Sequence, residues 1–114
     1  VMERARIVCL CGSTRFKGTF VYANLSETLA GKIVLSIGCD TRTDLDLFAH
    51  LAASERAAIK ARLDELHLRK IDLADEVLVL NVDGYVGEST GRELEYARQH
   101  GKAIRYLEPL AEEA

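Results

Sequence analysis

Hydrophobic positions along this chain fall into short unbroken runs and into longer stretches where apolar residues recur every three or four positions. Unbroken runs rich in branched residues are typical of buried strands, and the recurring pattern is typical of helices with an apolar face. The pattern predicts strands at 5–11, 32–37, 76–82 and 103–107, and helices at 16–30, 54–73 and 90–100. Residues 39–53 carry loop and capping residues and the start of a short helix near 45–51.

Apolar stripes run along two of these helices. In the helix at 16–30, two stripes follow the helical spacing, namely Phe16, Phe20 and Ala23, and Val21, Leu25 and Leu29. In the long helix at 54–73, one face is marked by Ile59, Leu63, Leu66 and Leu73. Such faces ordinarily pack against a core.

Strands that alternate with helices predict a parallel sheet with right-handed crossovers. The expected fold is therefore α/β, with a three-layer, mainly parallel, flavodoxin-like (Rossmann-like) sheet in a single domain spanning residues 1–114. In such sheets, ligands bind beyond the carboxyl ends of the strands, where the strand order changes direction. The loop at 12–15 and the loop at 83–90 compete for that place.

The composition is that of an ordinary globular domain and argues against several classes of function. Of 114 residues, 48% are hydrophobic and 29% are charged, and the net charge of -3 offers no excess positive field to nucleic acids. No apolar run approaches the roughly 18 residues of a membrane span, and the first residues do not resemble a signal peptide. We therefore expect a cytoplasmic protein that binds neither nucleic acid nor membranes.

The three cysteines lack the spacing of a metal site. Cys9 and Cys11 stand two residues apart in an apolar run, and we expect them to point to opposite faces of a strand, unable to hold one ion together. Cys39 is isolated in the sequence. Reduced and mostly buried thiols are therefore expected, rather than a disulfide or a zinc site.

The loop after the first strand carries residues suited to phosphate binding. Gly12 permits close approach of a ligand to the backbone, and Arg15 presents a guanidinium fork. Ser13 and Thr14 supply two hydroxyls ahead of a helix N-terminus, whose free N–H groups attract anions. A helix cap by Ser13 or Thr14, with Arg15 as a surface charge, fits equally well, and the residues alone favour neither interpretation.

Two further residues, Glu93 and His67, each have a structural and a functional interpretation. Thr90 and Glu93 have the spacing of a capping box, which the pattern alone favours. Alternatively, Glu93 lies in the first helical turn beside a ligand at the strand ends, where a carboxylate can act as nucleophile or base. His67 lies at the border of an apolar helix face, so a partly buried structural histidine is expected, with a role near the ligand as the alternative.

Two blocks of the sequence resemble the nucleoside 2-deoxyribosyltransferase superfamily, near its branch of small N-glycosidases that hydrolyse nucleoside 5'-monophosphates. The first block is the CGSxR motif at 11–15, which resembles the phosphate-binding turn of that branch. The second is the AD pair at 74–75 before an apolar strand, followed by TxxELxxA at 90–97, which resembles the start of the family's catalytic helix. The runs at 64–72 and 84–90 are similar to those of a subgroup near this branch.

The resemblance implies that Glu93 attacks the anomeric carbon of a nucleoside or nucleotide and forms a glycosyl ester, which water or another base then releases. His67 would hydrogen-bond the sugar or protonate the departing base. The residues implied to bind the substrate or its phosphate are Gly12, Ser13, Thr14, Arg15, Gly87, Glu88 and Ser89. We expect no cofactor and no metal, and the resemblance implies a homodimer or a larger homo-oligomer.

Three positions depart from the family pattern. His67 stands where the family has an aspartate that serves as acid or as sugar ligand, and Cys9 stands where the branch has a tyrosine. Gly87 replaces an aspartate or serine, whose duty passes to Glu88 or Ser89. The leading expectation is an N-glycosidase or glycosyltransferase acting on a nucleoside or its 5'-monophosphate. The alternatives are a nucleotide-binding module without catalysis and a structural or interaction domain.

Overall fold

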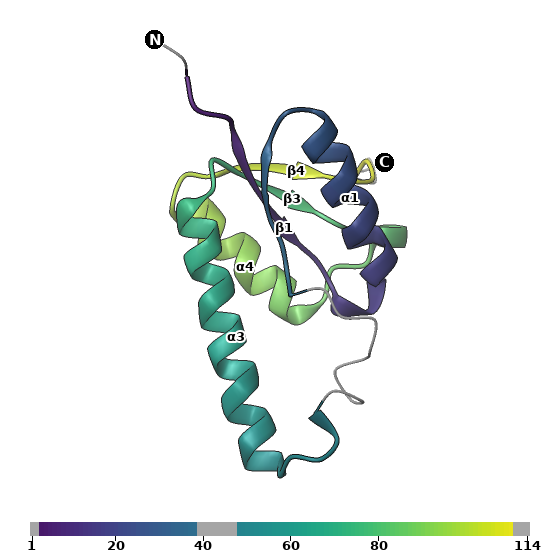
Figure 1. Ribbon diagram of the computed structural model, residues 1–114, viewed down its shortest axis with the longest axis vertical. Helices are drawn as coiled ribbons and strands as arrows, with labels where there is room; N and C mark the ends of the chain where they lie inside the picture. The colour runs from purple at the N-terminus through teal and green to yellow at the C-terminus, as the bar shows by residue number, and fades with distance from the viewer. Residues whose placement is uncertain (1–2, 39–47, 111–114) are drawn as a thin grey trace.

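The computed structural model describes residues 3–38 and 48–110 (Figure 1). The strands are β1 (Ile7–Cys11), β2 (Ile33–Leu35), β3 (Glu76–Val79) and β4 (Ala103–Tyr106), and the helices are α1 (Lys17–Leu29), α3 (Ala53–Leu73) and α4 (Glu88–Gln99). Two short 3₁₀ turns, η1 (Thr14–Phe16) and η2 (Val82–Gly84), follow β1 and β3. The seven predicted strands and helices are confirmed, and the expectations for residues 39–47 lie outside the described residues.

The four strands form one parallel sheet in the order β2-β1-β3-β4. Helix α1 covers one face, and α3 and α4 cover the other (Figure 1). The predicted three-layer, parallel α/β fold is therefore confirmed. The chain leaves β1 toward β2 on one side and continues to β3 on the other, so the strand order changes direction between β1 and β3.

β1 lies inside the sheet and sends its side chains alternately to the two faces. Val8 and Leu10 pack in the core cluster under α1, and Cys9 and Cys11 pack in the cluster under α3 and α4. The expectation that the two thiols point to opposite faces is therefore wrong. Side chains alternate with a period of two along a strand, so residues two apart share a face.

Only part of the predicted apolar helix faces reaches the core. Phe20 and Ala23 of α1 are buried. None of the four positions predicted to form the apolar face of α3 is buried, so that expectation is wrong; the buried residues of α3 are His67 and Ile71. The exposed apolar side chains on these helices are Val21, Tyr22, Leu25 and Leu29 of α1, and Leu63, Leu66 and Leu73 of α3. A sheet covers only one side of a helix, and the first half of α3 extends past the sheet (Figure 1). Among residues 3–38 and 48–110, no helix combines the length and apolar character that crossing a membrane requires.

A cluster of charged side chains lies at the start of β3, on the face covered by α1. The carboxylate of Glu76 is 4% exposed and accepts hydrogen bonds from Arg6 at 2.8 Å, Lys32 at 2.9 Å and Arg105 at 2.8 Å. Glu27 of α1 accepts from Lys32 and Arg105. Although burial opposes ionisation, these hydrogen bonds lower the pKa of Glu76 to about 2. The buried charge is therefore compensated by close partners.

Replacing Glu76 by Gln should lower the free energy of unfolding at neutral pH by roughly 2–3 kcal/mol, because three cations lose a shared carboxylate. The folded-state pKa lies below the ordinary value of 4.5, so the stabilisation is complete above that pH and disappears as the pH falls toward 2. Urea unfolding at several pH values measures the difference, which should shrink as the pH falls through this range.

The matched control is Glu95→Gln, which removes an exposed partner of Arg98 and should change the free energy of unfolding by less than about 0.5 kcal/mol. A difference between the wild type and Glu76→Gln that stays constant from neutral to acidic pH would contradict this account of the cluster.

Candidate functional site

The carboxyl ends of β1 and β3 lie side by side where the strand order changes direction. The loops that follow these two strands are in direct contact. Arg15 Nη2 donates a hydrogen bond to Tyr85 Oη at 3.2 Å, and the guanidinium carbon lies 4.4 Å from the centre of the Tyr85 ring. The ring of Phe16 meets the same tyrosine edge-on. The two loops that the sequence indicates therefore form one surface at the ligand-binding edge expected for this fold.

Ser13 is the cap of the η1 turn, because its Oγ accepts a hydrogen bond from the Arg15 N–H at 3.3 Å. The capping interpretation of this loop is therefore confirmed for Ser13, and Thr14 lies within the turn. Tyr85 was not predicted as a site residue. The sequence feature that could have indicated Tyr85 is its place between Gly84 and Gly87 after a strand, where small neighbours leave room for an aromatic ring.

α4 begins at Glu88, earlier than predicted, and its N-cap is Gly87. The Gly91 N–H donates to the Gly87 carbonyl at 2.9 Å. Thr90 is buried inside the helix, so Thr90 and Glu93 do not form the expected capping box. This expectation is wrong because the extended backbone of Gly87 lets the helix start sooner and places Glu93 beyond the first turn.

Glu93 lies on the side of α4 that faces α3. Together with Ser89 and Leu68, it lines a pocket of about 300 Å³ between the two helices. The Glu93 Oε2 atom is buried and makes no hydrogen bond to any residue that the structure describes. This burial raises the pKa of the Glu93 carboxyl group. Because buried polar atoms nearly always have a hydrogen-bond partner, this oxygen stands out as a candidate for ligand contact.

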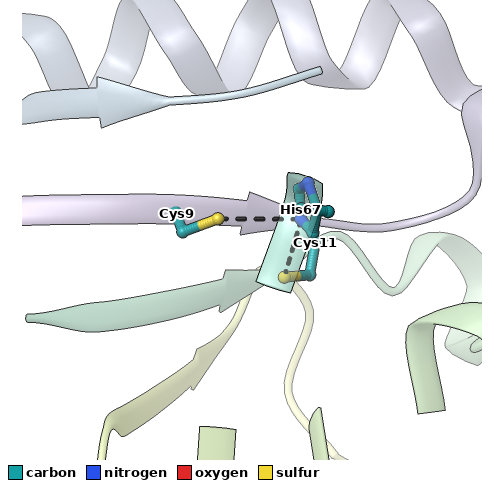
Figure 2. Close-up of side chains that lie close together, drawn as sticks. All are labelled: Cys9, Cys11 and His67. Carbon is teal, nitrogen blue, oxygen red and sulfur yellow. Dashed lines mark hydrogen bonds between the residues drawn. The ribbon is translucent and has the colours of Figure 1, made fainter. Parts of the chain in front are cut away.

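His67 of α3 is at the centre of a buried cluster (Figure 2). Its Nε2 atom lies 3.3 Å from Cys11 Sγ, 3.6 Å from Cys9 Sγ and 3.7 Å from Glu93 Oε2. His67 is 7% exposed, so the expected burial is confirmed, yet its ring faces three reactive groups. Sequence reasoning missed the two cysteines as neighbours of His67, although their spacing of two on a strand was the signal.

The members of this cluster change one another's proton affinity. Burial disfavours a charged imidazole, but Cys9 and Glu93 raise the pKa of His67 overall. The hydrogen bond between the two thiols lowers the pKa of Cys9 to about 6, although burial opposes this shift. The same hydrogen bond raises the pKa of Cys11, and burial raises it further. The pKa of the Cys9 thiol therefore lies below its ordinary value, and the pKa of His67 lies above its ordinary value.

The structure brings some of the predicted site residues into contact with one another and leaves others apart. His67 links Glu93 to Cys11, and Gly12 is the next residue after Cys11, so the buried cluster adjoins the loop at 12–15. No residue of that loop lines the pocket that contains Glu93. Glu88 points away: its side chain is 92% exposed and pairs with Arg92 of the same helix at 3.7 Å. Glu88 is therefore separate from the cluster around His67.

No protein-family model, curated protein or solved structure matches this chain. The fold defines a class of protein, the parallel α/β domains with helices on both faces of the sheet. Because many activities occur on that fold, the function has to be argued from the site residues.

The close approach of Gly12 to β3 can be tested through stability. A Cβ at Gly12 would lie 3.0 Å from Leu80 Cβ and 3.5 Å from Phe20 Cζ. We expect Gly12→Ala to lower the free energy of unfolding by about 1–3 kcal/mol, because Leu80 Cβ is fixed to the backbone and cannot rotate away. Denaturant unfolding measures the change.

Gly18→Ala is the matched control, because a Cβ at Gly18 in α1 meets nothing within 4 Å. This substitution should be neutral or should stabilise the protein by up to about 1 kcal/mol, since alanine favours a helix more than glycine does. Equal effects of the Gly12 and Gly18 substitutions would show that Gly12 is not tightly packed.

Proposed function

We propose that this protein cleaves the N-glycosidic bond of a nucleoside or a nucleoside 5'-monophosphate, with Glu93 as the nucleophile. The resemblance of the blocks at 11–15 and 90–97 to the nucleoside 2-deoxyribosyltransferase superfamily supports the class of reaction. The observation that carries the proposal is the buried Glu93 Oε2 atom, which has no hydrogen-bond partner among the described residues. His67 Nε2 lies 3.7 Å away, beyond hydrogen-bond distance, which leaves the oxygen able to bond to a substrate.

The proposed reaction has two steps. In the first, an oxygen of the ionised Glu93 attacks the C1' carbon of the sugar, and the bond from C1' to the base nitrogen breaks. A glycosyl ester forms on Glu93, and the base leaves with the electron pair and takes up a proton from water. In the second, a water molecule or a second base attacks C1' and releases the carboxylate. Attack by water gives hydrolysis, and attack by a base gives transfer.

His67 is assigned to positioning Glu93 in this proposal. Its Nε2 atom lies 3.7 Å from Glu93 Oε2, and the ring is enclosed by protein on the side of the two thiols. Its small exposed fraction favours this role over direct protonation of the base. A charged imidazolium at this distance would favour the ionised carboxylate, which is the form that attacks and the form that is released.

Arg15 is the proposed phosphate ligand. Stacking on Tyr85 fixes the plane of its guanidinium, and the described residues pair one of its roughly five N–H donors, through Tyr85 Oη. A fixed fork with further donors suits a phosphate group. Gly12, packed against Leu80, keeps the start of this loop close to the sheet.

Self-association is part of the proposal. The exposed apolar side chains of α1 and α3 named above are not covered by the described part of the chain. Exposed apolar side chains gain by being buried against a partner. These side chains support the homodimer or larger homo-oligomer that the family resemblance implies.

The reaction can be tested by incubating the metal-free protein with a panel of nucleosides and 5'-monophosphates and measuring free base by chromatography. Glu93→Gln should lower the rate of base release by about 10³-fold or more, because an amide is a poor nucleophile. Mass spectrometry of peptides from the protein quenched during turnover should locate the mass of the sugar on Glu93.

Glu65→Gln is the matched control, because Glu65 of α3 is exposed and pairs only with Arg69 among the described residues. It should leave the rate unchanged. If nucleotides bind, no base appears, and Glu93→Gln leaves the affinity unchanged, the protein is a nucleotide-binding module and the enzymatic proposal is wrong.

Arg15→Ala tests how the phosphate is bound. We expect kcat/KM for 5'-monophosphates to fall about 10- to 100-fold, as for the loss of a charged hydrogen bond, while kcat/KM for nucleosides stays the same. Arg98→Ala, an exposed arginine at the far end of α4, is the control and should change neither value. An unchanged preference for phosphorylated substrates in Arg15→Ala would remove Arg15 from the site.

A further inference from the structure

The cluster of Cys9, Cys11 and His67 has the composition and closeness of a metal-binding site. The two sulfur atoms and the imidazole nitrogen all lie within 4.8 Å of one another. Figure 2 shows both thiols of β1 directed toward the ring of His67. All three residues are buried, and the two cysteines have no exposed surface. Thiolate and imidazole are the ligands that zinc takes in protein sites.

The hydrogen bonds that His67 Nε2 can make do not account for this arrangement. The Nε2 atom of an imidazole either donates one proton or accepts one, so it makes one good hydrogen bond. Three groups nevertheless converge on it: the two thiols, at 3.6 and 3.3 Å, and Glu93 Oε2, at 3.7 Å. The Glu93 oxygen is left without a hydrogen-bond partner among the described residues. In a tetrahedral metal site, each ligand atom has the three other ligand atoms as close neighbours, and Nε2 has three such neighbours here.

The three distances from His67 Nε2 agree with those between ligands of a tetrahedral ion. Zinc bonds of about 2.3 Å to sulfur and about 2.0 Å to nitrogen or oxygen place a sulfur and a nitrogen ligand about 3.5 Å apart, and a nitrogen and an oxygen ligand about 3.3 Å apart. The observed separations from Nε2 are 3.6 Å for Cys9, 3.3 Å for Cys11 and 3.7 Å for Glu93. An ion can therefore enter with small movements of the side chains.

We propose that Cys9, Cys11 and His67 bind one zinc ion, with Glu93 as the fourth ligand. Binding releases to solvent the protons held by the four ligand groups and forms two zinc–sulfur bonds, one zinc–nitrogen bond and one zinc–oxygen bond. The ion neutralises most of the charge of two thiolates and a carboxylate, which are otherwise costly to bury together.

A bound ion has a consequence that rests on the proposed function. Glu93 cannot ligate zinc and attack a sugar with the same oxygen. A zinc ion bound to one oxygen would also hold the carboxylate in place and withdraw electron density from the other oxygen. Zinc would therefore suppress base release, and a chelator would restore it. The metal-free protein would be the active form, and the availability of zinc would regulate it.

The full chain, reduced and freed of metal with a chelator, is titrated with zinc alone and with cobalt(II) alone. We expect one equivalent of zinc to bind and to raise the melting temperature, and a chelator to reverse the rise. Cobalt(II) should give a thiolate charge-transfer band and the strong visible bands of a tetrahedral ion. Absence of binding at one equivalent, or cobalt spectra without thiolate bands, would overturn the proposal.

Variants assign the ligands. Cys9→Ser and His67→Gln should each weaken zinc binding at least tenfold, whereas His100→Gln should leave it unchanged. Circular dichroism without metal identifies any variant that fails to fold. Glu93→Gln, which leaves the three core ligands in place, gives the same assignment through cobalt: the thiolate band should remain and the visible bands should shift. Unchanged affinity in Cys9→Ser and His67→Gln, or unchanged visible bands in Glu93→Gln, would contradict the assignment.

The zinc site and the proposed function fail separately. Base release from a protein that binds no zinc would overturn the metal site and leave the enzymatic proposal standing. One tightly bound zinc in a protein whose metal-free form releases no base would do the reverse. Base release that continues at full zinc occupancy would overturn the ligand role of Glu93.

Discussion

The alternation of side chains along β1 is the constraint on which the rest of the structure depends. This strand pairs with β2 on one side and β3 on the other, so its backbone position is set by both neighbours. Val8 and Leu10 then hold α1, and Cys9 and Cys11 meet α3 and α4. The same two-residue period that builds both cores also places two thiols beneath one histidine.

Buried carboxylates at the two ends of the sheet differ in how many hydrogen-bond partners they have. Near the start of β3, the carboxylate of Glu76 is surrounded by three cationic partners at hydrogen-bond distance. Beyond the end of β1, Glu93 keeps one oxygen without a hydrogen bond among the described residues, beside an imidazole with more neighbours than it can bond. Satisfied buried groups stabilise a fold, and unsatisfied ones mark the places where a ligand completes the structure.

The sequence was sufficient to predict the fold but not the details of the site. Hydrophobic periodicity located the strands and helices, because burial imposes it directly. It could not show that Leu25 of α1 and Leu66 of α3 stay exposed, since the width of the covered face depends on how a helix lies on the sheet. The Thr90–Glu93 spacing suggested a cap, but Gly87 started the helix sooner. The two thiols were assigned to opposite faces of the strand, although residues two apart on a strand share a face.

The position of Cys11 couples the packing of the core to the chemistry of the proposed site. Its side chain belongs to the core and touches the proposed site, and the next residue opens the loop at the ligand-binding edge. A substitution there alters packing and chemistry in a single event. Ser89 lies outside both packed clusters, so a substitution there alters the lining of the pocket without changing the core.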